Sequence, residues 1–238
     1  MKLFLASRLN CYTKDEHGNR APCIIEDENL ILTNIKRSLS RLDNLLVIAN
    51  DPNDFEINDS RLNLLSKGFE MTGLSFKKKT VLDNRNIKLA KKLIEEADFI
   101  FLAGGKILQQ IKFFDKIKLT ALLKNSNAVI FGASAGAMNL TKEIFNFPEC
   151  LADIPEPRLV NGLGFADVII VPHFDGDSKT YQIHCEEVDI VNDYVLPFSK
   201  NKRMYGLPDG SYIMVENGVL KFYGAYYEIQ NTKVRKLV

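Results

Sequence analysis

Short apolar runs alternate along this chain with longer segments of helical period. The apolar runs, predicted as strands, lie at 2–6, 45–49, 80–82, 99–103, 128–131 and 168–172. Helices are predicted at 29–42, from a cap at Asp59 or Ser60 to a stop at Gly73, and at 86–97, 107–124 and 179–196. This alternation is typical of a parallel sheet covered by helices on both faces. The sequence therefore predicts an α/β fold, a three-layer sandwich with a mostly parallel sheet.

The C-terminal part follows a different pattern. Asp-Gly at 209–210 and Asn-Gly at 217–218 stand between aromatic and branched residues, which predicts a β-hairpin or meander. Because the 238 residues are 46% hydrophobic, they can bury a full core. We expect one domain spanning 1–238.

Charge and composition narrow the classes of partner. The 31 basic and 30 acidic side chains leave a net charge of +1, with no long block of either sign to attract nucleic acid or a membrane. The N-terminus lacks a signal-peptide core, and no apolar run approaches the about 18 residues that span a bilayer. The four cysteines show no paired CxxC spacing, as expected of reduced thiols. We expect a cytoplasmic protein without metal or organic cofactor.

The chemistry centres on the segment Gly132-Ala133-Ser134-Ala135-Gly136. It matches the GxSxG nucleophile elbow, in which a serine sits on a strained turn between a strand and a helix. The segment follows an apolar strand and precedes small residues suited to a helix start, as that motif requires. The alternative is a glycine-rich turn that only packs a helix on a sheet. We interpret Ser134 as a nucleophile.

Such a serine needs donors for the oxyanion that forms on its substrate. The elbow leaves the amide of Ala135 free at a helix start, and Gly104-Gly105 at the end of the preceding strand can supply a second amide. An ordinary strand-to-helix turn would explain the two glycines equally well. We expect Gly105 and Ala135 to form the oxyanion hole.

One of the three histidines is placed to act as a base. His173 ends the apolar run Val-Ile-Ile-Val-Pro, at the strand edge where α/β sheets bind ligands, and His17 and His184 lack that setting. Histidine can accept the serine proton and return it to a leaving amine. A strand-end histidine bonded to a loop is the structural alternative.

These residues resemble the dipeptidase E and cyanophycinase group of serine peptidases, whose fold is similar to class I glutamine amidotransferases. The resemblance covers most of the chain. It rests on Phe-Leu-Ala-Gly-Gly at 101–105, Ser-Ala-Gly-Ala at 134–137, Val-Pro-His-Phe at 171–174 and Gly-Leu-Pro-Asp-Gly-Ser-Tyr-Ile at 206–213.

The resemblance implies roles for individual residues. It implies that Ser134 is the nucleophile, that His173 is the base, and that an acidic residue of the connecting loop completes a triad. That acid falls in Pro-Glu-Cys at 148–150, and Glu149 is preferred over the nearby Asp153. Asp175 and Asp177 are further candidates. Physically, one carboxylate must orient the imidazole and stabilise its cation.

The chain departs from the family pattern at two lysines. Lys106 follows the paired glycines where family members commonly carry asparagine or another polar residue, and Lys179 stands in a segment where dipeptidase E has arginines. We expect Gly104, Lys106 and Lys179 to contact the substrate. Because lysine lacks the bidentate fork of arginine, specificity for aspartyl dipeptides stays open.

We therefore expect a serine peptidase that hydrolyses small peptides through an acyl-enzyme. An esterase or amidase would use the same groups, and a catalytically silent member could bind an anion through its lysines. A glutamine amidotransferase is disfavoured because its chemistry uses a cysteine where this elbow has Ser134. The C-terminal hairpin could serve as an edge for a homodimer, although we favour an intramolecular role for it.

Overall fold

The computed structural model describes residues 1–147, 158–176 and 189–237. Its main sheet has seven strands in the order β13-β12-β1-β7-β6-β4-β5. The five parallel strands are β1 (Lys2–Ala6), β4 (Asn44–Ile48), β5 (Lys78–Leu82), β6 (Phe99–Leu102) and β7 (Val129–Ala133). The antiparallel pair β12 (Tyr212–Glu216) and β13 (Val219–Tyr223) extends the sheet beyond β1. The predicted mostly parallel α/β sheet is confirmed.

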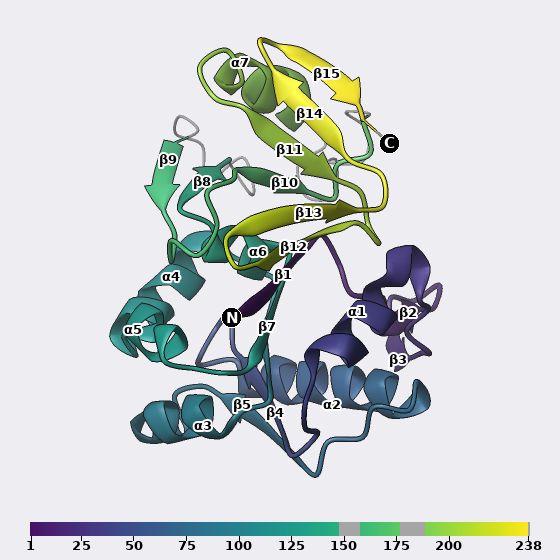
Figure 1. Cartoon of the computed structure of the whole chain (residues 1–238), viewed down its shortest axis with the longest axis vertical. Coiled ribbons are helices and arrows are strands. Elements are labelled where there is room, and N and C mark those ends of the chain that lie inside the picture. Colours follow the sequence, from purple (N-terminus) through teal and green to yellow (C-terminus); the bar gives the residue numbers. More distant parts are fainter. Residues whose placement is uncertain (148–157, 177–188, 238) are drawn as a thin grey trace.

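Helices cover both faces of this sheet. The connections β1 to β4 and β4 to β5 run across the sheet in one direction, and β5 to β6 and β6 to β7 run back. Because such crossovers are right-handed, the two sets of helices must lie on opposite faces. Figure 1 shows α1 and α2 on one side and α4 and α5 on the other. These helices are α1 (Ile31–Ser38), α2 (Phe55–Met71), α3 (Ala90–Glu96), α4 (Ile107–Lys116), α5 (Leu119–Lys124) and α6 (Ala135–Leu140).

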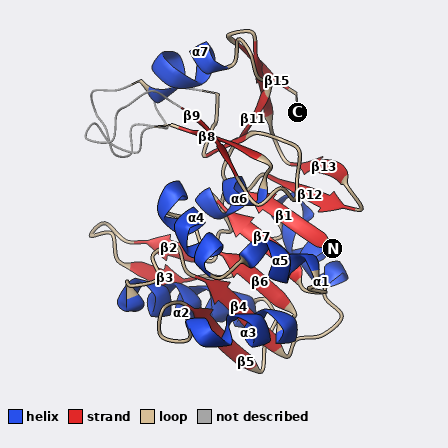
Figure 2. Ribbon diagram, turned by 90° about the vertical axis from the view of Figure 1, so that its left-hand side faces the viewer, coloured by secondary structure: helices blue, strands red, loops and turns tan. Residues whose placement is uncertain are grey.

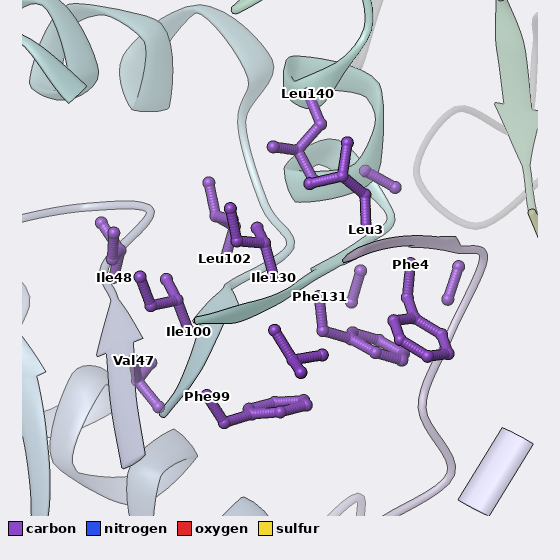
Figure 3. Close-up of a cluster of buried hydrophobic side chains, with 14 of the residues drawn as sticks. Leu3, Phe4, Val47, Ile48, Phe99, Ile100, Leu102, Ile130, Phe131 and Leu140 are labelled. Carbon is purple, nitrogen blue, oxygen red and sulfur yellow. The ribbon is translucent and has the colours of Figure 1, made fainter. Parts of the chain in front are cut away.

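The core lies between these layers and is dense in aromatic side chains. Phe4, Phe99 and Phe131 come from three strands and are fully buried, and Phe131 packs near both of the others (Figure 3). Branched residues of the parallel strands fill the rest, as expected of strands that are buried on both faces. This core holds the carboxyl ends of the strands in fixed positions.

A second, four-stranded sheet stands at one end of the molecule (Figures 1 and 2). Its order is β10 (Ile170–Pro172), β11 (Met204–Leu207), β14 (Tyr227–Gln230) and β15 (Lys233–Lys236). It has its own buried cluster, which includes Phe145, Phe174 and Ile229, beside a π-helical turn at Ile190–Val195 and the short α7 (Leu196–Phe198). Two small antiparallel pairs also lie among the described residues, β2 (Tyr12–Lys14) with β3 (Arg20–Pro22) and β8 (Glu143–Asn146) with β9 (Arg158–Asn161).

The predicted C-terminal hairpin is confirmed, but only one of the two turn signals in the tail closes it. The turn at Asn217-Gly218 closes the β12–β13 hairpin, as expected. Asp209-Gly210 does not close a hairpin, because β11 and β12 belong to different sheets. The segment between these two strands is a crossover from one sheet to the other, and this places Asp209 where the sheets meet.

Two helix predictions were also wrong in detail. The helix predicted over 107–124 is two helices, since Lys118 adopts a left-handed backbone with φ of 55° between α4 and α5. Helix α2 begins at Phe55, capped by Asp54, rather than at Asp59 or Ser60. The sequence expectation of a single domain stays a prediction, and most of the helix predicted at 179–196 lies outside the described residues.

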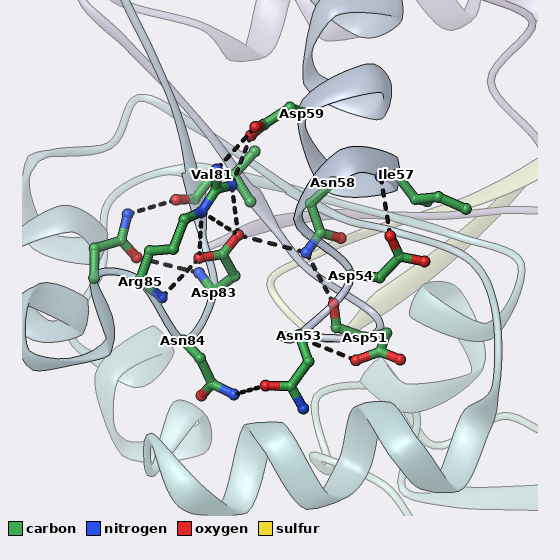
Figure 4. A network of polar contacts seen from close by, with 11 residues as sticks. Asp51, Asn53, Asp54, Ile57, Asn58, Asp59, Val81, Asp83, Asn84 and Arg85 are labelled. Carbon is green, nitrogen blue, oxygen red and sulfur yellow. Dashed lines mark hydrogen bonds and ion pairs between the residues drawn. The ribbon is translucent and has the colours of Figure 1, made fainter.

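A polar network closes one corner of the parallel sheet (Figure 4). Asp83, directly after β5, is fully buried and accepts hydrogen bonds from Arg85, which also binds the carboxylate of Asp59 on α2. These bonds to two carboxylates raise the pKa of Arg85 and keep it charged. The network fastens the first turns of α2 to the end of β5, at the edge strand farthest from β12.

Tight packing at the elbow makes one glycine substitution severe. A side-chain carbon at Gly136 would overlap the backbone carbonyl oxygen of Leu102. We expect Gly136→Ala to lower the free energy of unfolding by at least about 2 kcal/mol through overpacking. As a control, Gly218→Ala has open space and should lose only about 1 kcal/mol from its positive φ. Urea denaturation of both variants checks this, and equal losses would contradict it.

Candidate active site

Ser134 lies directly after β7, at the carboxyl edge of the parallel sheet. Its backbone is strained, with φ of 52° and ψ of −120°, and α6 begins at the next residue. A side-chain carbon at Gly132 would stand 2.6 Å from the carbonyl oxygen of Gly136, so the turn is too tight for larger residues. The geometry is therefore that of a nucleophile elbow.

His173 faces this serine from the second sheet. It directly follows β10, and its Nε2 lies 2.9 Å from Ser134 Oγ. Its backbone is also left-handed, with φ of 60°, and its side chain is 32% exposed. The structure thus brings together the two residues that the sequence predicted as nucleophile and base.

The carboxylate on the far side of the imidazole belongs to Asp209. Its Oδ1 lies 2.6 Å from His173 Nδ1. Glu149 and the alternatives Asp153 and Asp177 lie outside the described residues, so the structure does not test them, while the remaining candidate Asp175 is described and lies two residues after the histidine. Glu149 as the orienting carboxylate stays a prediction from the sequence, and among the described residues it is Asp209 that lies against Nδ1. In the sequence, Asp209 belongs to the motif Gly-Leu-Pro-Asp-Gly at 206–210 and to an Asp-Gly pair typical of turns, and neither pattern marks it as the acid of a triad.

Asp209 is held as a carboxylate by its neighbours. Partial burial works against ionisation, but hydrogen bonds with His173 and Ser7, together with the positive charge of Arg8, lower the pKa of Asp209 below its ordinary value. Arg8 Nη1 lies 3.7 Å from Asp209 Oδ2. At neutral pH the site therefore has a negative charge behind the imidazole.

This lowered pKa predicts an acid-dependent loss of stability. The pKa of Asp209 is lower in the folded chain than in the unfolded chain. Its ionisation therefore stabilises the fold at any pH above the pKa of the unfolded chain, which is about 4, and this stabilisation is lost as the pH falls below that value. We expect the free energy of unfolding to fall more steeply between pH 5 and pH 3 in the wild type than in Asp209→Asn, as measured by urea denaturation. Parallel curves would contradict the assignment.

The paired glycines lie against the nucleophile. A side-chain carbon at Gly104 would come 3.2 Å from Ser134 Cβ, so a larger residue there would require the nucleophile to shift by a few tenths of an ångström. Gly105, with φ of 139°, packs on the side chain of Asn50, whose amide group pairs with both the N–H and the carbonyl of Lys106 at 3.0 Å. Asn50 therefore fixes the loop that follows β6.

The amide on the helix side is also well defined. The N–H of Ser134 donates to the Ala6 carbonyl at 2.9 Å and is not available to a substrate. Ala135 is the first residue of α6, so its N–H has no acceptor within the helix. Of the backbone N–H groups of Ser134 and Ala135, only that of Ala135 is left for a substrate oxygen.

A buried polar chain connects the helix of the nucleophile to the glycine loop. Asn139 on α6 donates to Gln110 Oε1 at 2.8 Å, and Gln110 on α4 donates to the Ala103 carbonyl at 2.7 Å. Both side chains are fully buried, where such bonds are strong and rigid. The elbow and the glycine loop are thereby held in one arrangement.

The structure describes only one of the two lysines predicted to contact the substrate. Lys106 is exposed at the start of α4, while Lys179 lies outside the described residues. A cavity of about 580 Å³ borders Arg8 and Gly210 and is lined by apolar residues such as Ile25 and Met71, but neither Ser134 nor His173 lines it. We do not assign it to the substrate. Among the described residues there is no cluster of three metal-binding side chains and no helix able to cross a membrane.

Comparisons with known proteins fit this geometry. The family model "Peptidase family S51" matches residues 53–222, which include Ser134, His173 and Asp209. The chain belongs to peptidase family S51. It is therefore a serine-type peptidase. Among solved structures it is similar to a protein from Listeria monocytogenes EGD-e provisionally named Peptidase E, with a TM-score of 0.55 and 15% identity over 93% of this chain and 96% of the other. No curated protein gives a significant match.

Proposed function

We propose that this S51 peptidase hydrolyses short peptides through a Ser134–His173–Asp209 triad. The observation that carries the proposal is the unbroken series of contacts from Ser134 Oγ to His173 Nε2 at 2.9 Å and from His173 Nδ1 to Asp209 Oδ1 at 2.6 Å. A carboxylate can only accept, so Nδ1 carries the proton. Nε2 then presents its lone pair to the serine hydroxyl, as a general base must.

The reaction follows from this proton placement. Ser134 Oγ attacks the peptide carbonyl carbon while its proton moves to His173 Nε2. The C–N bond then breaks, and the same proton passes from Nε2 to the leaving amine. Water next attacks the acyl-serine ester, gives its proton to Nε2, and Ser134 recovers a proton from there. Asp209 stays ionised throughout and stabilises the imidazolium.

The negative charge on the carbonyl oxygen needs two donors. We assign these to the N–H groups of Ala135 and Gly105, because the elbow orients the first and Asn50 fixes the loop that carries the second. Each such donor is worth about 10²- to 10³-fold in rate. Gly104 keeps this loop close to Ser134.

The substrate class rests on the four motifs shared with the dipeptidase E group. Lys106 is exposed beside the glycine loop and would favour a substrate carboxylate, such as the C-terminus of a short peptide. Aspartyl specificity is not part of the proposal, and a cytoplasmic location and a homodimer stay predictions from the sequence.

A substrate panel tests this function. Wild-type protein is incubated with dipeptides, tripeptides, blocked peptides, longer peptides and simple esters, and released amino acids are measured by mass spectrometry. We expect turnover of unblocked short peptides, lost after treatment with a fluorophosphonate. Turnover of esters alone would favour the esterase, and a folded protein with no turnover and no fluorophosphonate adduct would favour a silent binding protein.

A further inference from the structure

Ser7 stands behind the triad and is buried there, and it lies before the residues that the family model matches. It directly follows β1, its exposed fraction is 0%, and its backbone N–H donates to the Ser211 carbonyl at 3.2 Å. It is thus anchored in the main sheet, next to the crossover that carries Asp209.

The hydroxyl of Ser7 contacts both partners of the His173–Asp209 pair. The backbone N–H of His173 donates to Ser7 Oγ at 2.7 Å, and Ser7 Oγ lies 2.9 Å from Asp209 Oδ1 and 3.4 Å from His173 Nδ1. A backbone N–H can only donate and a carboxylate can only accept. The single hydroxyl proton must therefore point at Asp209, while the oxygen lone pair receives the backbone of His173.

This arrangement ties together three separate chain segments. Ser7 belongs to the end of β1 in the main sheet, His173 to the end of β10 in the second sheet, and Asp209 to the crossover between the sheets. His173 also holds a left-handed backbone, which persists only when its surroundings fix it. The bond to Ser7 is a direct restraint on that backbone.

We propose that Ser7 is a positioning residue of this peptidase, whose hydroxyl sets the His173 ring and the Asp209 carboxylate in register with each other. This rests on the proposed triad. Ser7 does not touch the reacting atoms and acts only through the pair. Its loss should leave the binding of substrate little changed and slow the acylation of Ser134.

The side chain offers a matched test. The rate constant for fluorophosphonate labelling of Ser134 is measured in wild type, Ser7→Ala, Ser7→Thr and Ser7→Val, with folding checked by circular dichroism. Threonine and valine have nearly the same shape, and only threonine keeps a hydroxyl. We expect Ser7→Ala and Ser7→Val to label about 10- to 100-fold more slowly, and Ser7→Thr to label at least about fivefold faster than Ser7→Val.

A double-mutant cycle separates positioning from general support of the fold. If Ser7 acts through Asp209, the combined loss in Ser7→Ala/Asp209→Ala is smaller than the product of the single losses by at least about threefold. Three results would overturn the role of Ser7 and leave the triad standing. They are a double-variant loss of labelling rate equal to the product of the two single losses, a Ser7→Thr variant that labels no faster than Ser7→Val, and a Ser7→Ala variant that labels at the wild-type rate. A wild type that is folded and not labelled on Ser134 would overturn the triad as well.

Discussion

Replacing either Ser134 or His173 with alanine should reduce kcat/KM on the best peptide of the panel by about 10⁵-fold or more, because each removes the attack itself. The two residues act as one unit, since their side chains share a hydrogen bond of 2.9 Å. The double variant should therefore be no slower than either single variant, within about threefold.

The control for these two variants is their free energy of unfolding, which shows whether the loss of activity comes from the chemistry or from a less stable fold. Ser134 and His173 both have positive φ angles, and alanine, which keeps the Cβ of either residue, adds little backbone strain of its own. Urea denaturation should show a loss of no more than about 1 kcal/mol. If kcat/KM of the double variant fell by the product of the two single-variant reductions, the two residues would be acting independently, which would contradict a shared mechanism.

Replacing Asp209 with asparagine should lower kcat/KM by about 10³- to 10⁴-fold. Asparagine keeps the shape, but its NH2 group can donate a hydrogen bond to Nδ1, which stabilises the tautomer that carries its proton on Nε2, toward Ser134. The negative charge that would stabilise the imidazolium is lost at the same time.

Glu149→Gln is the matched control for this change. It converts a carboxylate to an amide in the same way, at the residue for which the family resemblance implies the acid role. With Asp209 already 2.6 Å from Nδ1, we expect Glu149→Gln to keep kcat/KM within about threefold of the wild type. The reverse pattern, a large loss in Glu149→Gln and a small one in Asp209→Asn, would place the acid in the connecting loop after all.

The sequence predicted the half of the site that depends on local pattern. The elbow at Ser134 and the strand-end position of His173 can both be recognised from neighbouring residues, because an apolar strand and a following turn determine them. The parallel strands were predicted for the same reason, since burial on both faces leaves a continuous apolar run.

Long-range contacts were harder to predict. Asp209 and Ser7 reach His173 only because a crossover joins two sheets and because β1 lies between β7 and β12. An Asp-Gly pair at a hairpin turn and at a crossover has the same local sequence, so nothing nearby distinguishes them. Ser7 is likewise an ordinary serine until the fold places His173 and Asp209 beside it.

The most direct measurement of the central claim is to map the fluorophosphonate adduct by mass spectrometry in wild type, Ser134→Ala and Asp209→Asn. We expect the wild type to carry one adduct, on Ser134, Ser134→Ala to carry none, and Asp209→Asn to label at least about 100-fold more slowly. An adduct on another residue, or labelling of Ser134 at the wild-type rate in Asp209→Asn, would contradict a nucleophile activated by His173 and Asp209.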